Sequence, residues 1–310
     1  MKKKIAVVVR PFGLIKSSIP KIKKKFLVKI YKNKETPNQN NLIRHLKDCE
    51  GVIAGDEIYN KYVLDNLPNI KVISRAGIGI DNIDLDYCKK KNITVLNTPD
   101  APSKSAAEFA FTLILNSIKK ISILNDNVKK KKWIRMPHDE FSDLIIGIIG
   151  YGRIGKRVAK LLLNTGFKKI LINDISKDQT KSIKSKKLKV VSKNEIFKYS
   201  DVISFHVPLT NKTINLFDKK KMRITKKDVC IINTSRGKVI NFKDLEFFLK
   251  KRHFSSVSLD VAPFEPYKGK LLKFKNCTFT PHNGSMSFNS RNKMENGSID
   301  NLINFFENEL

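Results

Sequence analysis

Short apolar runs alternate along the chain with segments in which apolar residues recur every three or four positions. Over the first hundred residues the apolar runs lie at 5–9, 26–30, 51–54, 71–74 and 94–96. Runs of this length without strict polar alternation are typical of parallel strands that helices cover on both faces. The pattern predicts a first unit built from repeated strands and helices.

A second set of apolar runs begins at residue 144. Helical spacing over 103–124 predicts one long helix between the two sets, and the same spacing over 290–310 predicts a helix in the tail. Two successive sets of this kind indicate an α/β protein with two doubly wound parallel sheets. The strands predicted in the second set are 144–149, 169–173, 189–191, 202–205, 229–233, 257–261 and 278–280.

The chain is strongly basic, with 61 Lys and Arg against 29 Asp and Glu and a formal charge of +32. The lysines form short runs throughout, without one dominant stripe or interleaved aromatic residues. We therefore interpret them as a solvated basic surface and expect no specific nucleic-acid partner. The alternative, nucleic-acid binding, predicts retention on DNA that falls steeply with salt. A positive field would also attract an anionic substrate.

Cysteine spacing and hydropathy bear on the compartment. Cys49, Cys88, Cys230 and Cys277 are scattered and form no Cys-x-x-Cys pair, so we expect neither a metal site nor a disulfide framework. No apolar run approaches the roughly 18 residues that span a bilayer. We expect a cytoplasmic protein that does not bind or span a membrane.

A glycine-rich turn follows the predicted strand at 144–149. Gly150 permits a tight turn, Gly152 lets the backbone approach a pyrophosphate, and Gly155 lets helix and strand pack closely. Asp174 ends the next predicted strand, where its carboxylate can accept hydrogen bonds from ribose hydroxyls. This context predicts dinucleotide binding, with NAD preferred over NADP because Asp174 would repel a 2'-phosphate. The nearby Lys177 tempers that preference.

Three polar residues end or follow predicted strands late in the second set. They are Arg236, Glu265 and His282. Each alone has an ordinary explanation, as a helix cap, a turn residue or a loop histidine. In an open parallel sheet, however, ligands bind beyond the carboxyl ends of the strands. Oxidation of a 2-hydroxy acid requires a cation for the carboxylate, a base for the hydroxyl proton and a partner for that base, and the three residues supply this set.

Ordered motifs cover almost the whole chain. They are the segments 74–84, 97–99, 105–108, 150–155, 206–210, 233–237, 260–261 and 281–282, together with Trp133. In these motifs the chain resembles the D-isomer-specific 2-hydroxyacid dehydrogenases, and within them most of all the D-3-phosphoglycerate dehydrogenases. The resemblance implies that Arg236 binds the substrate carboxylate, that His282 exchanges the proton and that Glu265 hydrogen-bonds His282.

The same resemblance implies further binding residues. Backbone N–H groups of Gly77, Ile78 and Gly79 would hold the carboxylate, and Arg75 would contact the substrate. Positions that match cofactor contacts are Ile78, Gly150, Gly152, Arg153, Ile154, Gly155, Asp174, His206, Val207, Pro208, Thr234, Ser235, Asp260 and Gly284.

The family architecture implies a Rossmann-type NAD-binding domain, residues 99–285, inserted into a flavodoxin-like substrate domain formed by 1–98 and 286–310. The active site is then expected in a cleft that closes over the substrate. The helix after Ser103 is expected to support a homodimer. None of these points comes from composition.

The substrate prediction has open alternatives. The main interpretation is an enzyme like 3-phosphoglycerate dehydrogenase, but Gly55 and Asp56 occupy a stretch where some such enzymes have a phosphate-binding arginine. Arg10 or Lys16 could substitute for it. The alternative within the class is a glyoxylate, hydroxypyruvate or other D-2-hydroxyacid reductase, which needs no extra cations for a phosphate. An alternative of another class is an NAD(H)-sensing corepressor or scaffold.

Overall fold

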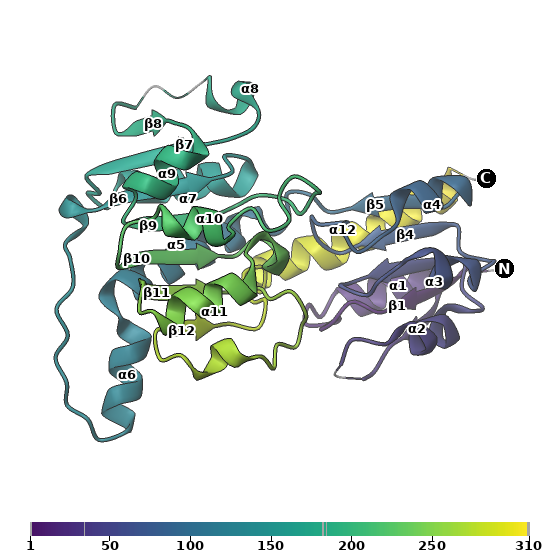
Figure 1. Cartoon of the computed structure of the whole chain (residues 1–310). Helices are drawn as coiled ribbons and strands as arrows, with labels where there is room; N and C mark the ends of the chain where they lie inside the picture. The colour runs from purple at the N-terminus through teal and green to yellow at the C-terminus, as the bar shows by residue number, and fades with distance from the viewer. Residues whose placement is uncertain (1, 34, 182, 184, 309–310) are drawn as a thin grey trace. The chain divides into compact units, whose positions relative to one another are not determined.

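The computed structural model describes residues 2–33, 35–181, 183 and 185–308. It divides into two compact units, one formed by Met1–Pro102 with Ser285–Leu310 and the other by Ser103–Gly284 (Figure 1). The last two residues of the predicted tail helix, 309 and 310, lie outside the described residues. Each unit contains one sheet, and both sheets are parallel throughout, which confirms the predicted α/β class with two doubly wound sheets.

The first unit has a five-stranded sheet in the order β2-β1-β3-β4-β5, the flavodoxin-like order. Its strands are β1 (Lys4–Val7), β2 (Leu27–Ile30), β3 (Gly51–Ala54), β4 (Val72–Arg75) and β5 (Thr94–Asn97). Its helices are α1 (Ser18–Lys25), α2 (Gln39–Leu46), α3 (Lys61–Asp65), α4 (Leu85–Lys90) and α12 (Phe288–Glu307).

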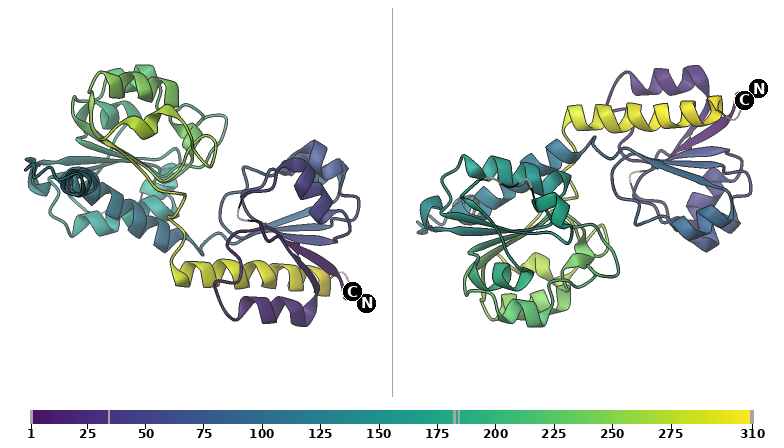
Figure 2. Two further views of the ribbon diagram at one scale, coloured as in Figure 1. Left: turned by 90° about the horizontal axis from the view of Figure 1, so that it is seen from below. Right: turned by 90° about the horizontal axis from the view of Figure 1, so that it is seen from above.

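Helices cover both faces of this first sheet because successive strand residues point to opposite sides. Ile5 and Val7 of β1 pack into the core formed with α1 and α12, whereas Ala6 packs into the core formed with α2. Helices α1 and α12 lie side by side on one face, although they come from opposite ends of the chain (Figure 2). This packing explains the continuous apolar runs.

The second unit has a seven-stranded sheet in the order β12-β11-β10-β9-β6-β7-β8, which contains the Rossmann order. Its strands are β6 (Ile145–Ile149), β7 (Lys169–Asn173), β8 (Leu188–Val190), β9 (Val202–Phe205), β10 (Val229–Asn233), β11 (Phe254–Leu259) and β12 (Cys277–Phe279). Its helices are α5 (Ser103–Lys119), α6 (Ile121–Lys129), α7 (Arg153–Leu163), α8 (Lys177–Thr180), α9 (Lys193–Tyr199), α10 (Lys219–Arg223) and α11 (Phe242–Lys250).

Several predicted bounds differ from the structure by one or more residues, and two elements differ most. The single helix expected over 103–124 is two helices, α5 and α6, because Lys120 adopts a left-handed conformation with φ of 55°. The Asn116 side chain accepts hydrogen bonds from the backbone and hydroxyl of Ser122 and so stabilises this break. The strand predicted at 257–261 starts earlier, as β11, and ends before Asp260, since a register shift beside Val229 extends its pairing with β10.

The described part of the chain contains neither a candidate membrane span nor a candidate metal site. No helix there is long and apolar enough to cross a membrane. No group of three or more His, Cys, Asp or Glu side chains in those residues is arranged to hold a metal ion.

Candidate active site

The glycine-rich turn joins β6 to α7, and β6 lies between β9 and β7 inside the second sheet. Gly150 has φ of 95°, and a side chain there would overlap the carbonyl oxygen of His206, which follows β9. A side chain at Gly155 would overlap the carbonyl oxygen of Gly150. At Gly152 nothing lies within 4 Å of the position that a side chain would take. The turn therefore packs tightly at its first and third glycines and leaves the second open, where α7 begins.

Asp174 follows β7, the strand beside β6. Its carboxylate accepts hydrogen bonds from the backbone N–H of Tyr151, at 2.6 Å, and of Ser176, at 2.8 Å. These bonds tie the acid to the glycine turn and fix its orientation. A carboxylate at this position can accept ribose hydroxyls and repels a 2'-phosphate.

Two buried polar atoms at the carboxyl ends of β9 and β10 have no hydrogen-bond partner in the described part of the chain. They are Nδ1 of His206 and Oγ1 of Thr234. The other ring nitrogen of His206 lies 2.9 Å from Oγ of Ser204. Burial lowers the pKa of His206 to about 4, so its ring is neutral near pH 7. Unpaired buried polar atoms are rare in native structures, so these two atoms fit a site that a polar ligand completes.

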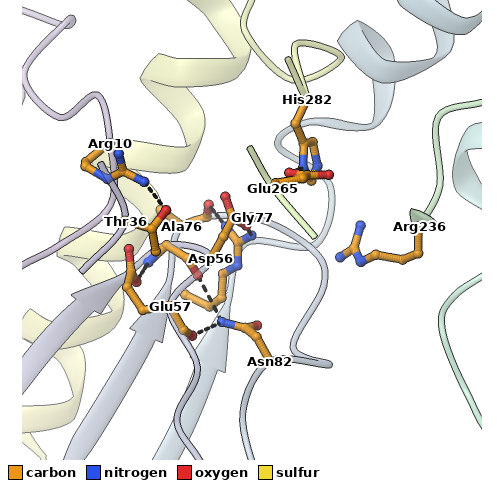
Figure 3. Close-up of polar contacts among 12 residues, drawn as sticks. Arg10, Thr36, Asp56, Glu57, Ala76, Gly77, Asn82, Arg236, Glu265 and His282 are labelled. Carbon is orange, nitrogen blue, oxygen red and sulfur yellow. Dashed lines mark hydrogen bonds and ion pairs between the residues drawn. The ribbon is translucent and has the colours of Figure 1, made fainter. Parts of the chain in front are cut away.

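His282 and Glu265 form a direct pair in the second unit. Nδ1 of His282 lies 2.9 Å from Oε2 of Glu265, and both side chains are partly exposed (Figure 3). The other carboxylate oxygen of Glu265 accepts a hydrogen bond from the backbone N–H of Ala262, at 3.0 Å. The glutamate is thereby oriented by the backbone and in turn orients the imidazole ring.

Asp260 holds the loop that carries His282. Its carboxylate is buried and accepts hydrogen bonds from Oγ1 of Thr280, at 2.6 Å, and from the backbone N–H groups of Asn283, at 2.7 Å, and Gly284, at 2.9 Å. Burial raises the pKa of this carboxyl, and the three donors oppose the shift. His282 itself has φ of 54°, which is uncommon for a residue other than glycine. The Asp260 bonds therefore maintain a strained loop conformation.

Arg236 lies three residues beyond β10 and is supported by Asn233. The side-chain amide of Asn233 donates to the Arg236 carbonyl oxygen, and Nη1 of Arg236 donates to the Ser235 carbonyl, both at 2.9 Å. In Figure 3 the guanidinium group extends toward the side on which the His282–Glu265 pair lies. The second unit thus brings a cation and a histidine–carboxylate pair to the carboxyl ends of its strands.

The first unit contains the predicted substrate-binding residues Arg75, Gly77, Ile78 and Gly79. The N–H of Gly77 donates to Oγ1 of Thr98, at 2.8 Å, and to the Arg75 carbonyl oxygen, at 3.0 Å. Gly77 is buried, so an incoming carboxylate would have to replace these partners. Ile78 and Gly79 are partly exposed and are the better placed of the three amides.

The remaining predicted contact residues fall near the same strand ends, except Ile78, which belongs to the first unit. Sequence reasoning missed the support roles of Thr98 and Ser204, because a hydroxyl between distant strand ends has no local signature. Asp260 stays a predicted cofactor contact, and the structure adds that its carboxylate binds the loop that carries His282. The other members of the set lie after β6 (Arg153, Ile154), after β9 (Val207, Pro208), after β10 (Ser235) and after β12 (Gly284).

Comparison with known proteins decides the family. Residues 111–284 match the NAD-binding domain of the D-isomer specific 2-hydroxyacid dehydrogenases. The chain belongs to this family. The dehydrogenase is therefore an NAD-dependent oxidoreductase that acts on the CH–OH group of D-2-hydroxy acids.

The dehydrogenase is similar over most of its length to several relatives. A glyoxylate reductase from Thermococcus litoralis is 30% identical over 306 residues, covering 95% of this chain and 92% of the relative. A hydroxypyruvate reductase from Thermotoga maritima is 36% identical over 232 residues, covering 73% and 74%. The crystal structure of an Aquifex aeolicus D-lactate dehydrogenase complexed with NAD and lactic acid has a TM-score of 0.85 at 28% identity, covering 98% of this chain and 96% of that one.

Proposed function

We propose that the dehydrogenase reduces glyoxylate or hydroxypyruvate with NADH and that Arg236, Glu265 and His282 are its catalytic residues. The observation that carries the proposal is the 2.9 Å pair between Nδ1 of His282 and Glu265. Such a pair is what an acid/base histidine requires, because its carboxylate partner fixes the ring orientation. Relatives named glyoxylate reductase and hydroxypyruvate reductase favour these substrates over the phosphorylated acid of the main sequence interpretation.

The proposed proton path runs through His282. Glu265 occupies Nδ1, so Nε2 is the atom that we assign to the substrate oxygen. During reduction it gives a proton to the keto oxygen as that oxygen becomes a hydroxyl. Arg236 binds the substrate carboxylate, and its positive charge also favours the negative charge that develops on the keto oxygen. The amides of Ile78 and Gly79 in the first unit provide further donors for the carboxylate.

The cofactor supplies the hydride when bound, and residues of the second unit fit it. Gly150, Gly152 and Gly155 form the turn for the pyrophosphate, and Asp174 accepts the ribose hydroxyls. The buried atoms of His206 and Thr234 that have no partner in the described residues support a polar ligand at the neighbouring strand ends. We assign the first unit to substrate binding and the second to NAD binding.

The test is steady-state reduction by the purified chain with NADH and a panel of 2-keto acids: glyoxylate, hydroxypyruvate, pyruvate and phosphohydroxypyruvate. We expect the highest kcat/KM with glyoxylate or hydroxypyruvate. Absence of turnover with the whole panel would refute the proposed activity and favour the corepressor alternative. A preference for phosphohydroxypyruvate would refute the substrate assignment alone.

The acid/base role has its own test in His282→Ala. We expect kcat to fall by at least 100-fold, since general acid–base catalysis contributes about 10²–10⁴-fold, while NADH binding measured by fluorescence persists. His138→Ala is the matched control, because His138 is an exposed loop residue of the same unit. Loss of NADH binding together with activity in His282→Ala would contradict the role.

We also propose that the chain forms a homodimer through α6 and the segment that follows it. Helix α6 has no buried residue. Trp133 is 82% exposed, and Ile121 and Ile134 are more than half exposed. Such clustered apolar exposure marks an interaction surface. Light scattering should give twice the 35.5 kDa chain mass, and Trp133→Glu should shift it to the monomer. The control Leu272→Glu, which changes a side chain that is 53% exposed, should not. A monomeric wild-type chain would refute the proposal.

A further inference from the structure

The carboxyl ends of β1 and β3 form the switch point of the first sheet. In the order β2-β1-β3-β4-β5, the chain leaves β1 and β3 toward opposite sides, and ligands of such sheets bind in the crevice at that point. The residues directly after β3 are Gly55, Asp56 and Glu57. A side chain at Gly55 would come within 3.0 Å of the Cα of Val9, so the two strand ends lie close together.

Arg75, the last residue of β4, is held at this edge by Asp56. Nη2 of Arg75 lies 2.6 Å from Oδ1 of Asp56, and Nη1 donates to the carbonyl oxygen of Ala76. The guanidinium also occupies the space that a side chain at Gly77 would need. The arginine side chain is 11% exposed, whereas that of Asp56 is 61% exposed. The carboxylate, rather than the guanidinium, is therefore the group presented to solvent.

A second carboxyl group lies behind this pair. Glu57 is buried, and its Oε2 accepts the backbone N–H of Gly55, at 2.7 Å. Burial raises the pKa of this carboxyl, the Asp56 charge raises it further, and the Arg75 charge opposes the shift. Arg75 thus faces the charge of Asp56 directly and a further carboxyl nearby. Although the chain carries a formal charge of +32, the positive charge of Arg75 at this edge of the sheet is balanced by neighbouring carboxyl groups.

From this arrangement we propose that Asp56 is a specificity determinant that excludes phosphorylated 2-keto acids. A phosphate requires positioned Arg or Lys side chains whose charge is available to it. Here Asp56 already holds the guanidinium group of Arg75, so the charge of Arg75 is not available to a phosphate dianion, and withholding a cation in this way sets specificity against the phosphorylated acid. The inference rests on the proposed function, because it concerns the substrate of the same site.

The test compares wild type with Asp56→Asn, using NADH with hydroxypyruvate and with phosphohydroxypyruvate. We expect the ratio of kcat/KM values to move toward the phosphorylated substrate by about tenfold or more, since a nearby charge changes anion binding on that scale. The additional change Arg75→Gln in the Asp56→Asn background should cancel the gain. Asp65→Asn is the matched control: it removes a carboxylate paired with Lys61 in the same unit and should leave the ratio unchanged.

Two further measurements separate this inference from the proposed function. Calorimetry with 3-phosphoglycerate and glycerate in the presence of NADH, which cannot oxidise either acid, reports phosphate discrimination without turnover, so an inactive wild type would refute only the proposed function. Asp56→Ser provides a second variant, and circular dichroism checks the fold of both. The inference would be overturned if a folded Asp56 variant kept the wild-type ratios of kcat/KM and of binding affinity between the phosphorylated and unphosphorylated acids. A wild-type preference for the phosphorylated acid would also overturn it.

Discussion

Removal of the Asp260 carboxylate should impair both the stability of the second unit and the turnover of the enzyme. The carboxylate is 2% exposed and accepts three hydrogen bonds, from Thr280, Asn283 and Gly284, around the left-handed backbone of His282. In Asp260→Ala these three donors lose their acceptor. In Asp260→Asn one oxygen keeps two of the bonds, but the new amide NH2 faces the N–H of Gly284.

The magnitude follows from the number of donors left without a partner. A buried donor without an acceptor costs about 1–3 kcal/mol, so the three bonds of Asp260 set a range of about 3–9 kcal/mol for Asp260→Ala. The raised pKa of the carboxyl shows that its charge is itself unfavourable to bury, which offsets part of this loss. We expect the free energy of unfolding to fall by about 3 kcal/mol in Asp260→Ala and by about 1–2 kcal/mol in Asp260→Asn.

Turnover should fall further than stability alone explains, because a displacement of a catalytic group by about 1 Å can cost roughly 100-fold. The assays are thermal unfolding, steady-state kcat with NADH at a temperature where every variant is folded, and hydrogen exchange over residues 280–284. Asp201→Ala is the matched control, since its carboxylate also accepts a backbone N–H, that of Ile145, in the same unit. It should lower the melting temperature and leave kcat within about twofold, as expected for loss of a structural hydrogen bond alone. Wild-type kcat and exchange in Asp260→Ala would refute the reasoning.

Two other predictions concern the glycine turn and the thiols. Gly155→Ala should lower both the melting temperature and the NADH affinity, because the new side chain meets the Gly150 carbonyl oxygen. Gly152→Ala should keep the melting temperature and lower only the NADH affinity. Equal effects of the two substitutions on the melting temperature would contradict the geometry assigned to the turn. Burial raises the pKa of Cys49 and Cys88 to about 11 and of Cys230 and Cys277 to about 12. At pH 8 about one thiol in a thousand or fewer is then ionised. Mass spectrometry should show iodoacetamide modifying the native chain far more slowly than the urea-unfolded chain, and equal rates would disprove thiol protection.

The periodicity of the chain predicted most strands of both sheets, because buried parallel strands leave a continuous apolar run that local sequence displays. The residues 51–54, 169–173, 202–205 and 229–233 are strands with those same bounds in the structure. The glycine turn was also readable, since steric demands at Gly150 and Gly155 act between near neighbours in a strand–turn–helix unit. The break between α5 and α6 at Lys120 could not be predicted, because the helical spacing of apolar residues continues across it.

The sequence showed that Arg236, Glu265 and His282 each follow a predicted strand. It also indicated a reaction class that needs these three residue types. Only the tertiary structure showed that Asp260 holds the histidine loop, that Thr98 already engages the Gly77 amide and that Asp56 holds Arg75. These contacts join residues about 20 positions apart whose side chains meet only because parallel strands end at the same edge of a sheet. Sequence patterns report which backbone segments are buried, whereas the partner of a polar side chain is decided by the packing of the strands.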